Sequence, residues 1–423
     1  MTADAIPSGP EAGADLPRFS SAEALVRSLR PDVPVYGFRP DVLATDAQTF
    51  LSAFGGKTAY AVKTNGEAFV LRTLCAAGIT AFDVASPREF AAVRAVSADA
   101  ELLYMHPVKA LSDIRLAFEA YDIRTLALDH EDEVAKILRV VHGLDLDPEE
   151  ITLCVRLATK GYAAYQLSKK FGAAPAHAVE LLQRIDRVGF RCGICFHVGS
   201  QVEDLDTYER ALASADWVRN RAGVALAVLD VGGGFPAPYG QDPKRREAPP
   251  LPQVGAMAEE VVREAHEWGF SDVPLVAEPG RVVVARCLSV IVRVLLKKGR
   301  RIYINDGVWG SLSDSWTGRI VLPARLIPDP ARVRRRGNPQ NIVPFRVFGA
   351  TCDSVDVLSR PFYLPETVDT GDFIEIGHIG AYSMSLRTRF NGFYPEKVVI
   401  VDEPFDLAGA EGAAIPEARH AAE

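Results

Sequence analysis

The stretch LAVLDVGGGFPA, residues 226–237, joins a short apolar run directly to three glycines and a proline. Apolar or β-branched runs of the same kind recur near residues 59–62, 79–84, 101–105, 123–128, 151–157, 191–198, 225–231 and 273–278. Most gaps between them have a helical pattern, such as SPREFAAVRAV, where Ser86 is an N-cap, Pro87 takes the first helical position and Glu89 follows three residues after the cap. Eight strands alternating with helices over about 220 residues predict an α/β fold, a parallel (β/α)8 barrel of the TIM type, which we assign to residues 39–281.

The pattern changes after this barrel. The strand signals VVVARCLSVIVRVLL (282–296), RIYIND, PFRVFGA, DFIEIGH and KVVIV follow one another with few helical patterns between them. They predict a mainly antiparallel β-sandwich or β-barrel domain, which we assign to residues 282–408 together with 18–38, because PVYGF (34–38) has the pattern of an extra strand. The ends, 1–17 and 409–423, are rich in Ala, Gly, Pro and acidic residues and are predicted to be flexible tails.

Composition places the chain among soluble globular proteins. Of its 423 residues 48% are hydrophobic and 24% charged, and 47 basic against 55 acidic side chains give a net charge of -8, which argues against a nucleic-acid partner. No apolar run reaches the roughly 18 residues that span a bilayer, and the start MTADAIPSGPEAGADLP lacks the pattern of a secretory signal. We therefore expect no membrane partner, a cytoplasmic location and six free cysteine thiols.

Chemically active residues follow the apolar runs. In a parallel barrel the carboxyl ends of the strands meet at one rim, so the residues placed there are Lys63, Asp83, Arg156, His197, the glycines 232–234 and the segment EPGR (278–281). Barrels often bind phosphate in the loops after strands seven and eight, where this chain has GGGF and EPGR. Glycines let backbone N–H groups approach an anion, and Arg281 adds a bidentate contact.

The glycine run also fits a dinucleotide-binding fingerprint. Gly232, Gly234 and Ala237 match G-x-G-x-x-A, but that motif must open a helix, and Pro236 and Pro238 interrupt the segment. The phosphate-loop interpretation is therefore preferred.

Lys63 follows an apolar strand in YAVKTN (60–65). A lysine is unfavourable there unless it is paired, reaches solvent or is used covalently. Together with a phosphate site and the carboxylate of Glu278 across the barrel, Lys63 predicts covalent attachment of pyridoxal 5'-phosphate, with Glu278 keeping the pyridine nitrogen protonated.

At this point the chain resembles the fold-type III pyridoxal-phosphate-dependent decarboxylases, which share the alanine-racemase-like fold, and most closely their ornithine/lysine decarboxylase branch. The matching blocks, between residues 60 and 393, are YAVKTN, FDVAS, KKFGA, FHVGSQ, DVGGGFP, AEPGR, NDGVWGS, TCDSVD and GAYSMSLRTRFNGF. In that family the TCD block is contributed by the neighbouring subunit, so the resemblance implies a homodimer with shared active sites.

The resemblance also implies a role for each matching position. The catalytic residues would be Lys63, His197, Glu278 and Cys352, and Cys352 would return a proton to the α-carbon after carbon dioxide leaves. The cofactor would be held by Lys63, Asp83, Arg156, His197, Ser200, Gly233, Gly234, Glu278, Gly280, Arg281 and Tyr382. The amino-acid substrate would be bound by Asp353, Asp314 and Phe390, and no metal is expected. Glu89 also corresponds to a family site position, but a capping box explains it equally well.

The segment after NDGVWG departs from the branch. Better-known members have a Tyr–Asp pair there that binds the substrate amine, whereas this chain has Thr317 and Gly318. Asp314 is placed to supply the missing carboxylate and Trp316 an apolar wall. Because Asp353 favours a cationic side chain, the implied reaction is decarboxylation of L-ornithine to putrescine, as in polyamine biosynthesis.

Several alternatives stay open from the sequence. Lysine or another modified diamino acid is the next substrate, and diaminopimelate follows, although TCDSVD offers no cation for its distal carboxylate. A racemase of the same fold would use a tyrosine where this chain has Cys352, and a non-catalytic relative of the fold is the remaining alternative.

Four other features of the sequence lie outside the predicted site. Cys192 and Cys195 have a metal-site or redox spacing, but they alternate within one strand, which predicts buried strand residues. His106 and His378 have no partner motif and are expected to be structural. Asp356 is either a site acid or a strand-end residue, and the basic run 331–336 is expected to be a solvated loop.

Overall fold

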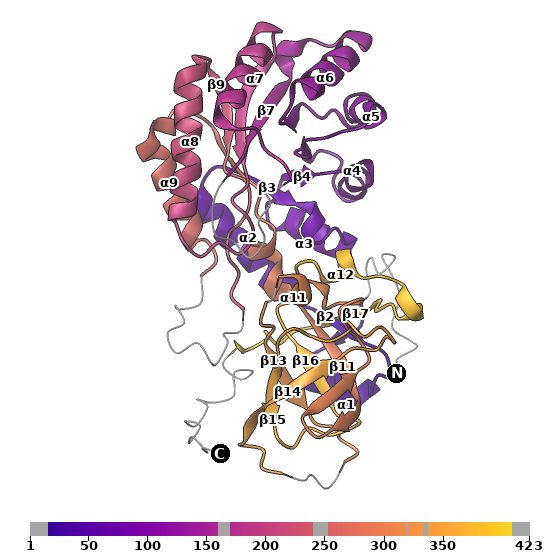
Figure 1. Ribbon diagram of the computed structural model, residues 1–423. Coiled ribbons are helices and arrows are strands. Elements are labelled where there is room, and N and C mark those ends of the chain that lie inside the picture. Colours follow the sequence, from indigo (N-terminus) through magenta and orange to yellow (C-terminus); the bar gives the residue numbers. More distant parts are fainter. Residues whose placement is uncertain (1–15, 160–169, 240–252, 319, 333–336, 408–423) are drawn as a thin grey trace. The chain divides into compact units, whose positions relative to one another are not determined.

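The computed structural model describes residues 16–159, 170–239, 253–318, 320–332 and 337–407 (Figure 1). These residues form two compact units. The described parts of Ala44–Ala237 and Pro252–Val283 make up the barrel unit, and those of Met1–Leu43, Pro238–Leu251 and Val284–Glu423 make up the β unit. The predicted tails lie outside the described residues, apart from residues 16 and 17, as does most of the basic run 331–336.

The barrel unit contains the predicted closed parallel barrel. Its strands are β3 (Lys57–Ala61), β4 (Ala81–Val84), β5 (Glu101–Tyr104), β6 (Thr125–Leu128), β7 (Thr152–Leu157), β8 (Arg191–Phe196), β9 (Leu226–Asp230) and β10 (Leu275–Ala277). Each strand pairs in parallel with the next, and the pairing of Val276 with Lys57 joins the last strand to the first. The (β/α)8 prediction is confirmed, because each of the eight apolar runs overlaps one barrel strand.

Helices alternate with these strands and lie outside them (Figure 1). They are α2 (Pro40–Phe54), α3 (Ala68–Ala76), α4 (Pro87–Arg94), α5 (Leu111–Tyr121), α6 (Glu131–Gly143), α7 (Pro175–Arg187), α8 (Asp206–Ala222) and α9 (Ala256–Ala265). At the start of α4, Ser86 Oγ accepts the N–H of Glu89, as predicted. The Glu89 carboxylate accepts the N–H of Ala85 at 2.7 Å rather than that of Ser86, so it reaches one residue beyond the usual capping box.

Small and medium apolar side chains form a cluster in the barrel interior. The interior cluster comprises Ala59, Ala81, Leu103, Met105, Ala127, Cys154, Cys195 and Val276. Cys192 lies on the other face of β8, where its thiol reaches the Leu182 carbonyl of α7. The two cysteines therefore alternate between faces, as expected for buried strand residues, and not as a metal pair.

The β unit is built on a nine-stranded sheet. Its strands are β1 (Arg18–Phe19), β2 (Val35–Phe38), β11 (Leu288–Lys298), β12 (Arg301–Ile304), β13 (Ala324–Ile327), β14 (Ile342–Phe348), β15 (Phe362–Pro365), β16 (Phe373–Ile376) and β17 (Lys397–Val401). β11 pairs antiparallel with β2, β12 and β16. β17 runs parallel to both β1 and β2, and β12 runs parallel to β14, so the sheet is mixed. PVYGF contains the extra strand β2, as expected.

One strand prediction is wrong in part. The first residues of VVVARCLSVIVRVLL form the short helix α10 (Arg281–Val284) and a 3-10 turn (Ala285–Cys287), and β11 begins only at Leu288. The three valines of α10 are all buried. A continuous apolar run has the same appearance in a buried helix and in a buried strand, which is why periodicity failed here.

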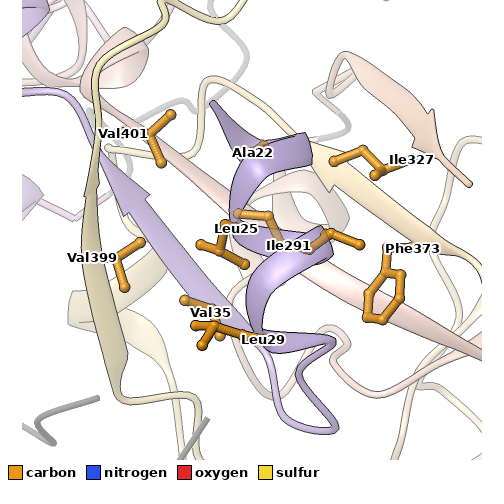
Figure 2. Packing of buried hydrophobic residues seen from close by; sticks show 10 residues of the cluster. Ala22, Leu25, Leu29, Val35, Ile291, Ile327, Phe373, Val399 and Val401 are labelled. Carbon is orange, nitrogen blue, oxygen red and sulfur yellow. The ribbon is translucent and has the colours of Figure 1, made fainter. Parts of the chain in front are cut away.

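The hydrophobic core of the β unit lies between the sheet and helix α1 (Ala22–Leu29) (Figure 2). Ala22, Leu25 and Leu29 on one side of α1 face Val35, Ile291, Ile327, Phe373, Val399 and Val401 of the strands. This core joins strands that are more than 350 residues apart in sequence, since Val35 and Val399 both belong to it. Within the described part of the chain, no helix is both long and apolar enough to cross a membrane.

Candidate active site

Lys63 lies at the rim of the barrel, in a 3-10 turn (Val62–Thr64) that directly follows β3. Its Nζ donates to Asp83 Oδ2 at 3.0 Å; the Asp83 side chain is buried, and 41% of the lysine side chain is exposed. Glu89 lies close to this pair, and burial raises the pKa of its carboxyl. The lysine is therefore held by a buried carboxylate while part of its side chain stays accessible, as an attachment point for a ligand requires.

His197 follows β8 directly and is partly buried. Its Nδ1 accepts the N–H of Gly199 at 3.2 Å. Burial, and then the positive charges of Lys63 and Arg156, lower its pKa well below the usual value. The imidazole is neutral at neutral pH, so it offers a flat uncharged ring beside the lysine.

Glu278 is a buried acid directly after β10, and Asp230 is a second one at the end of β9. Burial raises the pKa of Glu278 well above its usual range, and the neighbouring Asp230 and Asp83 raise it further. Burial also raises the pKa of Asp230 to about 7. A carboxyl group in this environment is suited to a ligand that carries a protonated nitrogen, because such a ligand supplies the missing positive charge.

The glycine run packs its backbone closely against other rim residues. Gly232 and Gly234 have φ angles of +68° and +116°, and a Cβ on Gly233 would come within 3.1 Å of His197 Nε2. No helix opens within residues 231–239, so the dinucleotide fingerprint is not formed.

Arg281, only 5% exposed, donates from Nε to Ser200 Oγ at 3.1 Å. A buried guanidinium beside a hydroxyl and a glycine loop has the chemistry of an anion site.

Arg156 lies on β7, with its guanidinium 5.6 Å from the centre of the Phe171 ring. Phe171 belongs to the KKFGA block, of which Lys169 lies outside the described residues. His106 contacts the edge of the same ring, and its Nδ1 accepts the N–H of Val108. Burial lowers the pKa of His106, which fits the expected structural role.

The barrel unit therefore brings together ten of the eleven predicted cofactor-binding residues: Lys63, Asp83, Arg156, His197, Ser200, Gly233, Gly234, Glu278, Gly280 and Arg281. They supply an amine, a neutral aromatic ring, a buried acid and a buried cation beside a glycine loop. These are the groups that the aldehyde, ring, ring nitrogen and phosphate of pyridoxal phosphate require, so the residues fit the cofactor. No cluster of three or more metal-ligating side chains occurs among the residues that the structure describes.

The remaining predicted residues, Cys352, Asp353, Asp314, Phe390 and Tyr382, belong to the β unit. Cys352 is the exposed one of the six cysteines, and both its backbone N–H and its thiol donate to Asn391 Oδ1 at 3.1 Å. Asn391 has a φ of 52°, in the left-handed region that asparagine tolerates better than most residues. The sequence analysis missed Asn391, although the Asn-Gly pair in RFNGF signalled a turn at this position.

Helix α11 (Ser313–Thr317) carries Asp314, which is buried, and Trp316, which is 41% exposed. The ring of Trp309 lies 6.5 Å from that of Trp316 and 5.9 Å from that of Phe390. Asp353 Oδ1 accepts the N–H of Val355 at 3.0 Å. Two acids and an aromatic cluster thus occur in one unit.

Tyr382 and His378 stand out by their backbone. Both are non-glycine residues with positive φ, 59° for Tyr382 at the start of α12 (Ser383–Leu386) and 54° for His378. Strain of this kind persists where surrounding contacts hold the residue, and it is common at ligand sites. His378 Nδ1 contacts the Pro238 carbonyl oxygen at 2.6 Å, and burial lowers its pKa to about 4, so it is a neutral structural histidine.

Asp356 has a structural role. Its two carboxylate oxygens accept the backbone N–H groups of Val308 and Thr351 and the hydroxyl of Thr351, at 2.7–2.9 Å. A Cβ on either Gly307 or Gly349 would lie closer than 2.5 Å to Asp356 Oδ1. The carboxylate therefore joins the NDGVWGS and TCDSVD loops, which decides between the two interpretations left open by the sequence.

Comparison with known proteins supports the cofactor indicated by this geometry. The family model described as "Pyridoxal-dependent decarboxylase, pyridoxal binding domain" matches residues 42–285. A lysine/ornithine decarboxylase of Selenomonas ruminantium is 31% identical over 363 residues, which cover 82% of this chain and 84% of that protein.

Solved structures are similar over most of the chain. The arginine decarboxylase of Paramecium bursaria Chlorella virus, bound to agmatine, has a TM-score of 0.75 at 25% identity and covers 89% of this chain and 98% of its own. A Vibrio vulnificus lysine/ornithine decarboxylase complexed with putrescine has a TM-score of 0.74 at 27% identity, over 91% of this chain and 99% of its own. From the family match and the geometry of the rim, the chain belongs to the pyridoxal-dependent decarboxylases of the alanine-racemase-like fold and uses pyridoxal phosphate.

Proposed function

We propose that this enzyme decarboxylates L-ornithine to putrescine, as a homodimer that shares its active sites. The observation that carries the proposal is the buried acid Asp314, together with the partly exposed Asp353, in the β unit of an enzyme whose relatives act on basic amino acids. A carboxylate that is largely shielded from water favours a substrate with a distal ammonium group. Lysine and other diamino acids are the next candidates.

The barrel residues divide the chemistry between them. When bound, pyridoxal phosphate supplies an electron sink for the electrons that carbon dioxide leaves behind. Lys63 Nζ is the attachment point, and Asp83 keeps the amine at the rim. The neutral His197 ring would lie against one face of the cofactor ring, and Arg281 and Ser200, which contact each other, would hold the phosphate together with the glycine loop. The Glu278 carboxylate would stabilise a positive charge on the ring nitrogen, and that charge would favour loss of the substrate carboxylate.

Cys352 is proposed as the proton donor to the α-carbon. Its thiol donates to Asn391 Oδ1, and this contact orients the side chain. A thiol titrates close enough to neutrality to give up a proton during turnover. The neighbouring Asp353 and Phe390 are proposed to hold the substrate side chain.

A carbon dioxide release assay over several amino acids tests the substrate. With added cofactor, ornithine, lysine, arginine, diaminopimelate and carboxylated polyamines are compared at equal concentration. We expect the highest kcat/KM for ornithine, with lysine second. A clear preference for arginine or diaminopimelate would contradict the proposal while leaving the family assignment intact.

Cys352→Ala tests the proton donor. We expect turnover to fall on the order of 10²-fold and the yield of amine per carbon dioxide released to drop, because the α-carbon loses its acid. Both products are measured in the same reaction. Mixing Cys352→Ala chains with Lys63→Ala chains should restore part of the activity, since a mixed dimer has one site with both residues. An unchanged amine yield would remove Cys352 from the mechanism.

Asp314→Asn tests the substrate carboxylate. We expect the KM for ornithine to rise about tenfold while kcat changes by less than about threefold, because the lost charge acts on binding of the distal ammonium. Steady-state kinetics give both parameters. Asp402→Asn, which removes an exposed carboxylate of the same unit, is the matched control. If both variants leave KM unchanged, Asp314 does not contact the substrate.

A further inference from the structure

Asp230 is a carboxylate in the apolar interior of the barrel. It is the last residue of β9, and its strand neighbours are Cys195 of β8 and Val276 of β10, both members of the interior cluster. Only 1% of its surface is exposed. An ionised carboxylate among such neighbours is unfavourable unless a partner or a proton compensates it. Asp230 begins the DVGGGFP block and lies within the family match, but the predicted site residues do not include it.

One carboxylate oxygen of Asp230 lacks a hydrogen-bond donor as long as the neighbouring acid Glu278 is ionised. Oδ1 accepts the N–H of Gly232 at 2.8 Å, whereas Oδ2 is buried and has no N–H or O–H donor among the described residues. The side chain of Glu278 lies within hydrogen-bonding reach of Asp230. Two ionised carboxylates can only accept, so this hydrogen bond exists only when one of them holds a proton.

Gly232 fixes the two acids relative to each other. Its N–H binds Asp230, and its carbonyl oxygen accepts the N–H of Glu278 at 2.8 Å. The residue has a φ of +68°, and a Cβ would lie 2.0 Å from the Phe196 carbonyl oxygen, so only glycine fits. One peptide therefore bridges the two side chains, which is a built arrangement rather than a chance contact.

The charged groups around the pair favour one shared proton. Asp83 adds a negative charge and Lys63 a positive one, so they oppose each other. Burial raises the pKa of the Cys154 and Cys195 thiols, which stay neutral. Burial raises the pKa of both acids, and the hydrogen bond between them raises the pKa of Glu278 while it lowers that of Asp230. These opposite directions favour Glu278 as the holder of the shared proton.

We propose that Asp230 is a positioning residue that keeps Glu278 protonated in the cofactor-free enzyme, so that Glu278 supplies the proton of the cofactor's ring nitrogen on binding. The Glu278 O–H bond breaks and an N–H bond forms, no electrons are exchanged, and Glu278 remains as the carboxylate partner of the new cation. The inference rests on the assigned cofactor and not on which amino acid is decarboxylated.

Asp230→Asn separates this role from packing. Asparagine keeps the size of the side chain but carries no negative charge, and its amide can donate to an ionised Glu278, so the pKa of the Glu278 carboxyl should fall. In the variant the ring nitrogen must take its proton from water. The ratio of the variant's Kd for pyridoxal phosphate to that of wild type should therefore rise by up to about tenfold per pH unit between pH 6.5 and 8. Fluorescence titration of the cofactor-free protein measures this, and comparing variants cancels the titration of the free cofactor.

Stability of the cofactor-free protein gives an independent readout. The folded pKa values of both acids lie above the unfolded values, so the folded wild type binds more protons and loses stability as pH rises from about 4.5 to 7 and beyond. Asp230→Asn removes the part of this proton uptake that belongs to Asp230 and reduces the part that Asp230 induces in Glu278. Its Tm should exceed that of wild type by a margin that grows with pH, on the order of 2–4 °C at pH 8. A merely structural aspartate would lower Tm at every pH.

Two controls complete the experiment. In a Glu278→Gln background, Asp230→Asn should leave the pH dependence of the Kd unchanged, because Asp230 acts through Glu278. If Asp230→Asn does not fold, infrared spectra of cofactor-free wild type should show a protonated carboxylic acid at pH 7 that disappears in Glu278→Gln. A Kd with wild-type pH dependence in Asp230→Asn, or no such infrared band, overturns the inference, whereas the substrate screen can succeed or fail independently.

Discussion

Lys63→Ala is expected to abolish both cofactor attachment and decarboxylation. The side chain is the amine at the barrel rim, held 3.0 Å from Asp83 and still partly exposed. Without it no covalent bond to the cofactor forms, and we expect kcat/KM to fall at least ~10³-fold. The purified wild type should be yellow with added cofactor, and the variant should lack the absorbance of the lysine-bound form.

Lys57→Ala is the matched control. Lys57 lies at the start of the same strand, with an exposed ion pair to Glu101. Its loss should change activity by less than twofold, because an exposed pair of this kind contributes little. Borohydride reduction followed by peptide mass analysis should place the cofactor on Lys63 in the wild type. A colourless, folded wild type with cofactor present, or a fully active Lys63→Ala, would refute the assigned role.

Glu278→Gln is expected to lower kcat far more than it weakens cofactor binding. Glutamine has the same shape but cannot hold the charge opposite a protonated ring nitrogen. Removing one preorganised charge of this kind typically lowers kcat by about 10²–10³-fold, equivalent to about 2.7–4 kcal/mol. The Kd for pyridoxal phosphate should change by less than about tenfold, because the phosphate contacts and Lys63 remain.

Single-turnover kinetics and a cofactor titration separate the two effects. Glu101→Gln, on an exposed carboxylate of β5, controls for loss of a charge elsewhere in the barrel unit. Equal losses in cofactor affinity and in kcat would show that Glu278 only binds the cofactor and does not favour the reaction.

The fold followed from local sequence patterns where those patterns are periodic. The apolar runs alternate with helical patterns, and every run overlaps a barrel strand. Local patterns failed where the chain is buried on all sides, as in Val282–Val284, because such a run has no polar face to mark its period. They also could not show that β17 lies parallel to β2, since that pairing joins residues more than 350 positions apart.

The site residues also differ in how far the sequence revealed them. The amine, acid and arginine at the strand ends were visible in sequence because parallel strands of a barrel end at one rim. Asp356 was ambiguous until the structure showed its carboxylate occupied by the backbone of two loops. Asn391 was missed because its contact with Cys352 spans 39 residues and leaves no local pattern.

The barrel, the family and the cofactor could be inferred from the sequence, because each depends on residue types at fixed distances along the chain. The protonation of the acids, in contrast, depends on contacts that form only in the folded protein. Asp230 is one polar residue at the end of an apolar strand, and nothing nearby in sequence shows that it meets Glu278, 48 positions later. Whether a carboxyl group holds a proton depends on its burial and on charges brought close by folding, and these are properties of the assembled barrel.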